Sequence, residues 1–189
     1  MKIDMSHIKT GNSGDWSVEE FEASELWYRI SLMKSGRGVP PGKYLRLKRG
    51  RTVVMSNTPD EIRDFSQFVW RAKGRILVNG LGLGCVLTAL LDKPEITEVI
   101  VVEQSKDVIN LISGSFNDSR LTIVHADAFE YTPTGRFDAV WHDIWDHITA
   151  DNLQYMTKLH RKYARRTDWQ DSWCKKQCQR LKRQEQLQY

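Results

Sequence analysis

Residues 75–90 constrain the fold more than any other part of the sequence. They open with a short apolar run of the length and bulk expected for a buried parallel strand. Gly80, Gly82 and Gly84 follow at alternate positions, and an apolar helical pattern comes next. A strand that turns into a helix through glycines lets a ligand approach the backbone closely and aims the helix N-terminus at it. Glycine-rich turns also join elements that bind nothing, so the pattern alone predicts only a strand, a turn and a helix.

Polar residues follow three further predicted strands. One of these strands ends in Glu103, 19 positions after Gly84. In nucleoside-binding and dinucleotide-binding α/β units, an acid about 20 residues beyond the glycines accepts hydrogen bonds from ribose hydroxyls. Two later apolar runs lead into Asp127 and Asp143. Because open α/β sheets bind ligands at the C-terminal edge of their strands, these residues predict a binding site there, with turn chemistry as the alternative.

Residues 75 to about 147 resemble the nucleoside-binding half of the class I S-adenosylmethionine-dependent methyltransferase superfamily. Within it they are most similar to the spermidine synthase (polyamine aminopropyltransferase) branch. Val78 stands two positions before the first glycine, where that branch carries no acid. Glu103 matches the branch's ribose-binding Glu, and Asp127-Ala128-Phe129 resembles its Asp-Gly-Phe, whose Asp meets the adenine amino group. Residues 143–146 resemble its Asp-x-x-Asp, whose acids deprotonate and orient the attacking amine.

The resemblance implies S-adenosylmethionine, or its decarboxylated form, as the cofactor, with a small molecule as the substrate. The expected cofactor-binding residues are Gly80, Gly82, Gly84, Glu103, Gln104, Asp127, Ala128 and Asp143. The expected catalytic residues are Asp143 and Asp146, one accepting the proton while the other fixes the nucleophile. Two acids this close are expected to titrate as a coupled pair. Capping of the next helix is the alternative role of Asp146, and His142 and His147 offer an alternative base.

Departures from the branch's pattern favour a methyl acceptor over a polyamine. Leu83 stands where the branch has an Asp that contacts the amino-acid end of the cofactor, and Ser105 stands where it has a second Asp. The resemblance also stops after the fourth expected core strand. The first hypothesis is therefore a small methyltransferase of unknown acceptor. The alternatives are an aminopropyltransferase-like enzyme that uses decarboxylated S-adenosylmethionine, and a non-catalytic protein that binds an adenosyl ligand.

The resemblance implies an α/β fold with a Rossmann-like, mostly parallel sheet of core strand order 3-2-1-4. We expect three segments along the chain. Residues 1–58 form an N-terminal helix plus a β-hairpin, and residues 59–150 form the nucleoside-binding core. Residues 151–189 form a basic helical segment that packs on the core.

Two helix-entry signals lie before the first core strand. Ser17 and Glu20 have the spacing of a capping box, and the apolar pattern after them predicts a helix to about Lys34. Thr58 precedes a proline and an acid in the same arrangement, which predicts a second helix to about Ala72.

Between these helices, residues 44–47 and 52–55 predict a β-hairpin. Its connecting turn, residues 48–51, carries three basic side chains. These side chains, together with Arg37, could contact a phosphate or a carboxylate. Charge solvated at a hairpin turn is the alternative interpretation.

The C-terminal segment is strongly basic. Residues 151–189 hold ten Lys or Arg and four Asp or Glu, a net charge of +6, against +4 for the whole chain. Apolar residues recur at three-residue and four-residue spacing from Leu153 to Tyr163, which predicts a helix. One interpretation is a helix packed on the sheet with its basic face in water. The others are a nucleic-acid contact through residues 158–183 and a partner or homodimer surface.

Cysteine usage and hydropathy bear on the compartment. Three cysteines, an odd number, predict no disulfide framework, so a reducing cytoplasm is expected. Cys174 and Cys178 are four apart, a spacing that suits one helix face rather than a zinc knuckle, and no metal site is expected. No apolar run approaches the roughly 18 residues of a membrane span. The N-terminus lacks the apolar core of a secretory signal.

Overall fold

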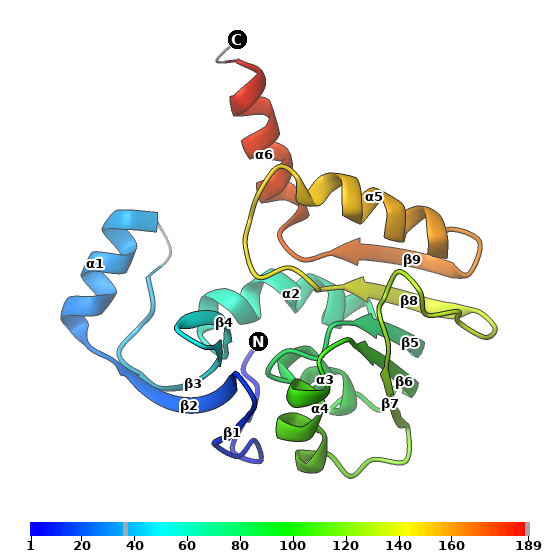
Figure 1. Cartoon of the computed structure of the whole chain (residues 1–189), viewed down its shortest axis with the longest axis horizontal. Coiled ribbons are helices and arrows are strands. Elements are labelled where there is room, and N and C mark those ends of the chain that lie inside the picture. Colours follow the sequence, from blue (N-terminus) through cyan, green and yellow to red (C-terminus); the bar gives the residue numbers. More distant parts are fainter. Residues whose placement is uncertain (36–37, 188–189) are drawn as a thin grey trace.

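The structure, a computed structural model, describes residues 1–35 and 38–187 and contains two β-sheets (Figure 1). Arg37, for which a phosphate or carboxylate contact is expected, lies outside the described residues. In chain order the elements are β1 (Gly11–Ser13), β2 (Trp16–Ala23), α1 (Glu25–Ser35), β3 (Gly42–Arg49), β4 (Thr52–Ser56), α2 (Pro59–Arg71), β5 (Gly74–Asn79), α3 (Cys85–Leu91), β6 (Ile96–Glu103), α4 (Lys106–Ile112), the 3-10 turn η1 (Ser113–Ser115), β7 (Leu121–His125), β8 (Phe137–His142), α5 (Asn152–Tyr163), β9 (Thr167–Ser172) and α6 (Lys175–Gln186).

The core is a five-stranded, wholly parallel sheet of order β7-β6-β5-β8-β9, so the chain has the expected α/β, Rossmann-like architecture. Its central strands are buried on both faces, which explains their continuous apolar sequences. Because side chains alternate along a strand, β5 contributes to two apolar clusters. Ile76 and Val78 pack with residues of α2 and α3, whereas Leu77 packs with Leu159 and Tyr163 of α5.

The fifth strand, β9, corrects the prediction that the sheet stops after four strands and that residues 151–189 are helical. β9 pairs in parallel with β8, and Ala139 lies opposite Trp169. Helix α5 is the crossover between these two strands. The sequence of β9 is polar because it lies at the edge of the sheet, where no other strand of the described residues pairs with its outer side. Trp169 and Trp173 are therefore not on one helical stripe.

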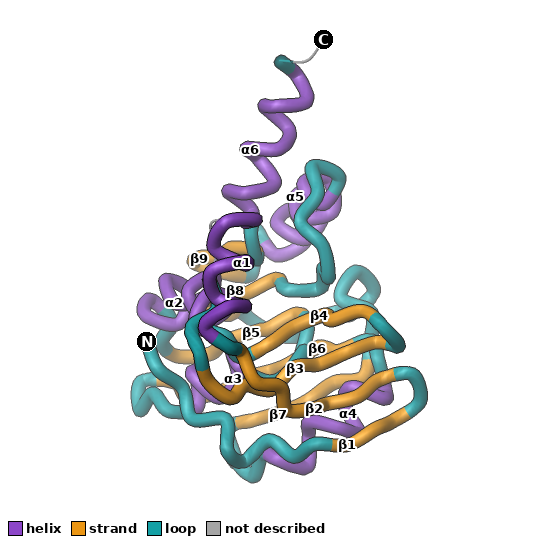
Figure 2. The backbone as a smooth tube through the Cα atoms, turned by 90° about the vertical axis from the view of Figure 1, so that its left-hand side faces the viewer, coloured by secondary structure: helices purple, strands orange, loops and turns teal. Residues whose placement is uncertain are grey.

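The N-terminal segment forms a four-stranded antiparallel sheet of order β1-β2-β3-β4, whose strands run across the view in Figure 2. The expected hairpin is confirmed as β3 and β4, but the expected helix from Ser17 is wrong. Residues 16–23 are strand β2, which pairs with β3 over its full length, and helix α1 begins only at Glu25. Eight residues of strand pairing outweigh a capping-box signature, which is a local and weak signal.

The second expected helix is confirmed as α2, but its cap differs from the prediction. The Thr58 side chain caps none of the described backbone N–H groups. Glu61 instead accepts hydrogen bonds from the backbone N–H and the hydroxyl of Ser56, at 2.8 Å each, which ties the start of α2 to the end of β4. At the other end, the Lys93 ammonium donates to the carbonyls of Val69 and Ala72. Helix α2 thus joins the two sheets at fixed positions.

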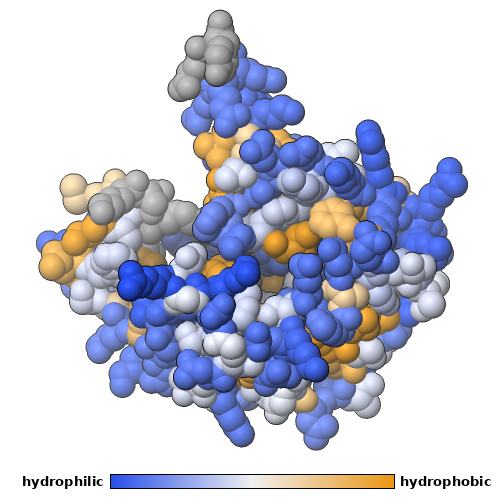
Figure 3. Space-filling view, in the orientation of Figure 1, coloured by the Kyte–Doolittle hydropathy of each residue, from blue (hydrophilic) through white to orange (hydrophobic). Residues whose placement is uncertain are grey.

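Helix α6 extends away from the rest of the molecule in both views of the backbone (Figures 1 and 2). Its outer part is hydrophilic (Figure 3). In the described residues, no helix is both long and apolar enough to cross a membrane.

Phe68 of α2 tests whether β9 belongs to the core. Its ring lies 5.0 Å from that of Trp141 on β8 and 5.2 Å from that of Trp169 on β9, centroid to centroid. We expect Phe68→Ala to lower the free energy of unfolding by about 3–5 kcal/mol, because it leaves a cavity between helix and sheet. Trp70→Ala, on the exposed side of the same helix, is expected to change it by less than about 0.5 kcal/mol. Urea unfolding measures both, and equal costs would contradict this packing.

Candidate functional site

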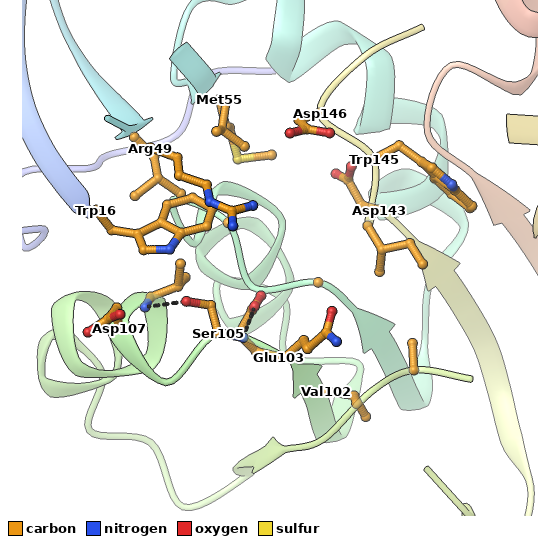
Figure 4. Close-up of a pocket in the computed structure, with 18 of the residues that line it drawn as sticks. Trp16, Arg49, Met55, Val102, Glu103, Ser105, Asp107, Asp143, Trp145 and Asp146 are labelled. Carbon is orange, nitrogen blue, oxygen red and sulfur yellow. Dashed lines mark hydrogen bonds between the residues drawn. The ribbon is translucent and has the colours of Figure 1, made fainter. Parts of the chain in front are cut away.

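A cleft of about 590 Å³ lies at the C-terminal edge of the parallel sheet (Figure 4). Its volume falls within the range of small-molecule sites. The cleft is lined by Asp15, Trp16, Leu47, Arg49, Val54, Met55, Gly80, Gly82, Val102, Glu103, Gln104, Ser105, Asp107, Val108, Asp127, Ala128, Phe129, Asp143, Ile144, Trp145 and Asp146. The two sheets therefore both contribute to it, with the antiparallel sheet supplying the residues before position 56.

The glycine turn between β5 and α3 brings backbone to the cleft wall. Gly80 and Gly82 line the cleft, and both have left-handed φ values, +99° and +52°. A Cβ on Gly80 would lie 1.9 Å from the carbonyl oxygen of Asp143, and one on Gly82 would lie 2.7 Å from the sulfur of Met55. Gly84, although expected to contact the cofactor, is not among the lining residues. A Cβ there would meet the Phe116 ring at 2.9 Å, so this position has no room for a side chain, and its contact with the cofactor stays a prediction.

Glu103 stands at the end of β6, next to the glycine turn. Its Oε2 accepts a hydrogen bond from the backbone N–H of Leu81 at 2.8 Å, and its Oε1 accepts one from the N–H of Ser105 at 2.7 Å. The Ser105 hydroxyl in turn caps α4 by accepting from the N–H of Val108 (Figure 4). The carboxylate is thus fixed at the cleft wall. Each oxygen keeps a second lone pair with which it can accept a further hydrogen bond.

The loop after β7 is fixed from both sides. Asp127 Oδ1 accepts a hydrogen bond from the N–H of Phe129 at 2.7 Å. The Lys162 ammonium of α5 donates to the carbonyls of Ala128 and Phe129, at 3.1 and 2.5 Å. Lys162 therefore does not lie on a solvated basic face, as expected for this helix, but holds the loop of the cleft. Gln104 also lines the cleft, and its carbonyl lies 3.0 Å from Nε2 of His125.

Asp143 is a partly buried acid at the cleft wall. Its backbone N–H donates to the carbonyl of Asn79 at 2.8 Å, which continues the pairing of β8 with β5. Burial raises the pKa of its carboxyl to about 7, and the negative charges of Glu61, Asp64 and Glu103 act in the same direction. The Trp141 indole N–H, 3.4 Å from Oδ2, opposes that rise.

Asp146 lines the same cleft but is exposed. It lies on the same side of the cleft as Asp143 (Figure 4). The acids that raise the pKa of Asp143 are others, so the expected coupling between these two carboxyls is not the dominant one. Capping is not the role of Asp146, because the N-cap position of α5 is occupied by Asp151.

His142 is not the alternative base that the sequence suggested. It is fully buried and lies 2.9 Å from Asn79 through Nδ1 and 3.0 Å from Gln170 through Nε2. Burial lowers the pKa of its imidazole to about 3, so the ring is neutral and structural at ordinary pH. His147 is exposed, with Nδ1 2.6 Å from the carbonyl of Asp146.

The antiparallel sheet contributes lining residues that the sequence analysis did not single out, among them Trp16 and Met55, together with Arg49 of the basic turn. The backbone N–H of Leu83 donates to the sulfur of Met55 at 3.2 Å, which fastens β4 to the glycine turn. The basic turn at residues 48–51 was the only sequence signal for this group. Trp16 gave none, because its segment resembled a helix start.

Two further kinds of site bear on the sequence predictions, a metal centre and a basic surface. Within residues 1–35 and 38–187, no group of three or more His, Cys, Asp or Glu side chains is placed to hold a metal ion. A second hollow of about 530 Å³ lies at the end of α5 and is lined by Gly135, Arg136, Arg161, Lys162, Ala164, Arg165 and Arg166. The nucleic-acid contact through residues 158–183 and the homodimer surface stay predictions.

Comparison with known proteins gives structural matches only. No protein-family model and no curated protein matches the chain. It is similar to spermidine synthase from Thermotoga maritima, with 20% identity and a TM-score of 0.48 over 80% of this chain and 53% of that one. It is also similar to a spermidine synthase in complex with the transition state analogue AdoDATO, with 20% identity and a TM-score of 0.45 over 70% and 44%.

A third similar structure is the glycopeptide N-methyltransferase MtfA complexed with S-adenosyl-L-methionine. The identity is 18% and the TM-score 0.42, over 57% of this chain and 49% of that one. The chain thus spans about half the length of the solved structures it matches. At these identities and TM-scores the matches assign no activity to this chain.

The raised pKa of Asp143 predicts a pH-dependent cost to stability. Its carboxyl titrates near 3.8 when the chain is unfolded and near 7 when folded, so the folded state binds more protons between these values. Wild-type stability is therefore expected to fall as pH rises from about 4 to about 7. Asp143→Asn should remove this loss and be more stable than wild type by about 1–3 kcal/mol at pH 8, with no gain at pH 4. Thermal unfolding across this range measures it.

Asp146→Asn is the matched control, because it makes the same charge change on an exposed side chain of the same loop. It should not reproduce the pH-dependent gain. A gain of equal size in both variants would mean that net charge, not burial of Asp143, is responsible.

Proposed function

We propose that this chain binds S-adenosylmethionine in the cleft and acts as a transferase, most simply a methyltransferase. The observation that carries the proposal is the convergence of Glu103, Asp127 and Asp143 on one cleft beside the glycine turn. These acids end three different strands of one parallel sheet, β6, β7 and β8, or follow them closely. That edge is where open α/β sheets bind nucleosides.

The residues present fit an adenosyl sulfonium. The fixed Glu103 carboxylate offers acceptor lone pairs to ribose hydroxyls. The loop that holds Asp127, Ala128 and Phe129 offers a carboxylate and an aromatic ring to an adenine. Lys162 holds that loop in place through its carbonyls. The acidic lining of the cleft suits the positive charge of the sulfonium.

When bound, S-adenosylmethionine would supply a methyl group on a sulfur that is already a good leaving group. The remaining work of the protein is to place the acceptor in line and to remove its proton. Asp143 suits the second task, because a carboxyl with a pKa of about 7 can take up a proton near neutral pH. Asp146, exposed at the cleft wall, would orient the acceptor.

The acids around Asp143 bear on the acceptor. Glu61 and Asp64 of α2 add negative charge to its surroundings, which favours an acceptor with a basic nitrogen. Leu83, at the position where the branch carries an Asp, is fully buried and packs into the core. Methyl transfer is therefore preferred over aminopropyl transfer from decarboxylated S-adenosylmethionine. A protein that binds the ligand without turnover is the remaining alternative.

Ligand binding depends on Glu103 under this proposal. Isothermal titration calorimetry of the wild type with S-adenosylhomocysteine should give a saturable heat. Glu103→Ala is expected to weaken that affinity about 10- to 100-fold, because hydrogen bonds to a charged acceptor are lost. Glu95→Ala removes an exposed acid outside the cleft and should leave the affinity unchanged. No heat with the wild type would refute the proposal.

Turnover separates an enzyme from a binding protein. Formation of S-adenosylhomocysteine from S-adenosylmethionine would be followed with a panel of primary and secondary amines. Asp143→Asn is expected to lower kcat about 100-fold or more, because it removes the proton acceptor while keeping the size of the side chain. The wild-type rate should rise with pH through about 7 and then level. Equal turnover in wild type and variant would remove Asp143 from the chemistry.

A further inference from the structure

Charge is distributed unevenly over the cleft. Its lining includes six acids: Asp15, Glu103, Asp107, Asp127, Asp143 and Asp146. Among the described residues that line it, Arg49 is the sole basic side chain. The positive charge of this side chain repels a cationic ligand. It favours binding only when the ligand also carries a negatively charged group.

Strand geometry aims Arg49 into the cleft. Successive side chains of a strand point to opposite faces. On β3, Arg46 and Lys48 both pair with Glu19, at 2.7 and 3.0 Å, whereas Leu47 and Arg49 line the cleft. Figure 4 shows the Arg49 side chain reaching from β3 into the cleft.

The Arg49 guanidinium remains available to a ligand. It lies over the Trp16 ring, 5.7 Å from its centroid. It makes no ion pair with any other described residue, in contrast to Arg46 on the same strand. The side chain is exposed to the cleft rather than packed in the core. Trp16 and Arg49 lie directly opposite each other in the pairing of β2 with β3.

The donor offers one group that matches this cation. S-adenosylmethionine carries a carboxylate at its amino-acid end, and the decarboxylated form lacks it while keeping both positive charges. A guanidinium binds a carboxylate through two parallel hydrogen bonds. The strand beside β3 reaches the glycine turn, where Met55 contacts Gly82 and Leu83, and the side chain of Leu83 itself is buried and offers no polar contact there.

We propose that Arg49 binds the carboxylate of the adenosyl donor and so makes the cleft selective for S-adenosylmethionine over its decarboxylated form. This inference rests on the proposed function and deepens it. The antiparallel sheet is then part of the cofactor site, since its third strand decides which donor is accepted. It also decides the group transferred, because only the donor with the carboxylate is an ordinary methyl donor.

Titration of two donors against three proteins tests the assignment. The full chain as wild type, as Arg49→Gln and as Arg51→Gln would each be titrated with S-adenosylmethionine and with decarboxylated S-adenosylmethionine. Arg51→Gln is the matched control, because it removes the same charge from the same hairpin at an exposed position outside the cleft lining. Thermal unfolding of each variant checks that the fold is kept.

The wild type should bind S-adenosylmethionine at least about 10-fold more tightly than the decarboxylated form. Arg49→Gln should abolish that preference by weakening the first ligand about 10- to 100-fold while changing the second by less than about threefold. Arg51→Gln should behave as wild type. The role of Arg49 would be refuted, with the proposed function left intact, by either of two results. One is an equal loss of affinity for both donors in Arg49→Gln, and the other is a wild-type preference for the decarboxylated donor. Absence of binding of either donor to the wild type would refute the proposed function instead.

Discussion

Two backbone hydrogen bonds at the C-terminal edge of the parallel sheet hold the ends of three strands together beside the cleft, and the rest of the site depends on them. The N–H of Gly80 donates to the carbonyl of Val102, and the N–H of Asp143 donates to that of Asn79, both at 2.8 Å. They extend the strand pairing by one residue at the point where β5, β6 and β8 end. As a result the glycine turn, Glu103 and Asp143 are held at one edge. The close approach of the Asp143 carbonyl to Gly80 also explains why that position has no room for a side chain.

The second layer of the site comes from contacts that join the two sheets. Glu61 binds the end of β4, Met55 contacts the glycine turn, and the hydroxyl of Ser13 donates to Asp107 of α4 at 2.7 Å. The antiparallel sheet is thereby held over the open edge of the parallel one. This arrangement brings Trp16 and Arg49 to the cleft although they lie far from the glycine turn in sequence. The cleft therefore depends on packing between segments that are far apart in the sequence. Local sequence motifs account only for the part of its lining at the C-terminal edge of the parallel sheet.

The difference between local motifs and non-local packing explains which parts of the fold and the site the sequence could predict. The turn at Gly80 and the acids Glu103, Asp127 and Asp143 follow apolar strands directly, so strand length and polarity place them at one edge without knowledge of the fold. Strand β9 was missed because an edge strand needs few apolar residues. The prediction of a helix from Ser17 was wrong because the capping-box spacing occurs there by chance. The segment is a strand, and its stability comes from pairing with β3. No local pattern distinguishes Arg49, whose role depends on the face of β3 it occupies, from its solvated neighbours.

The central claim is that the edge formed by β6, β7 and β8 holds an adenosyl group. A crystal structure of the chain with S-adenosylhomocysteine tests it most directly. The account predicts the ribose hydroxyls within hydrogen-bond distance of Glu103, the adenine beside Asp127 and Phe129, and the thioether sulfur facing Asp143. Adenosyl density at any other site, or a ribose that does not contact Glu103, would contradict the account.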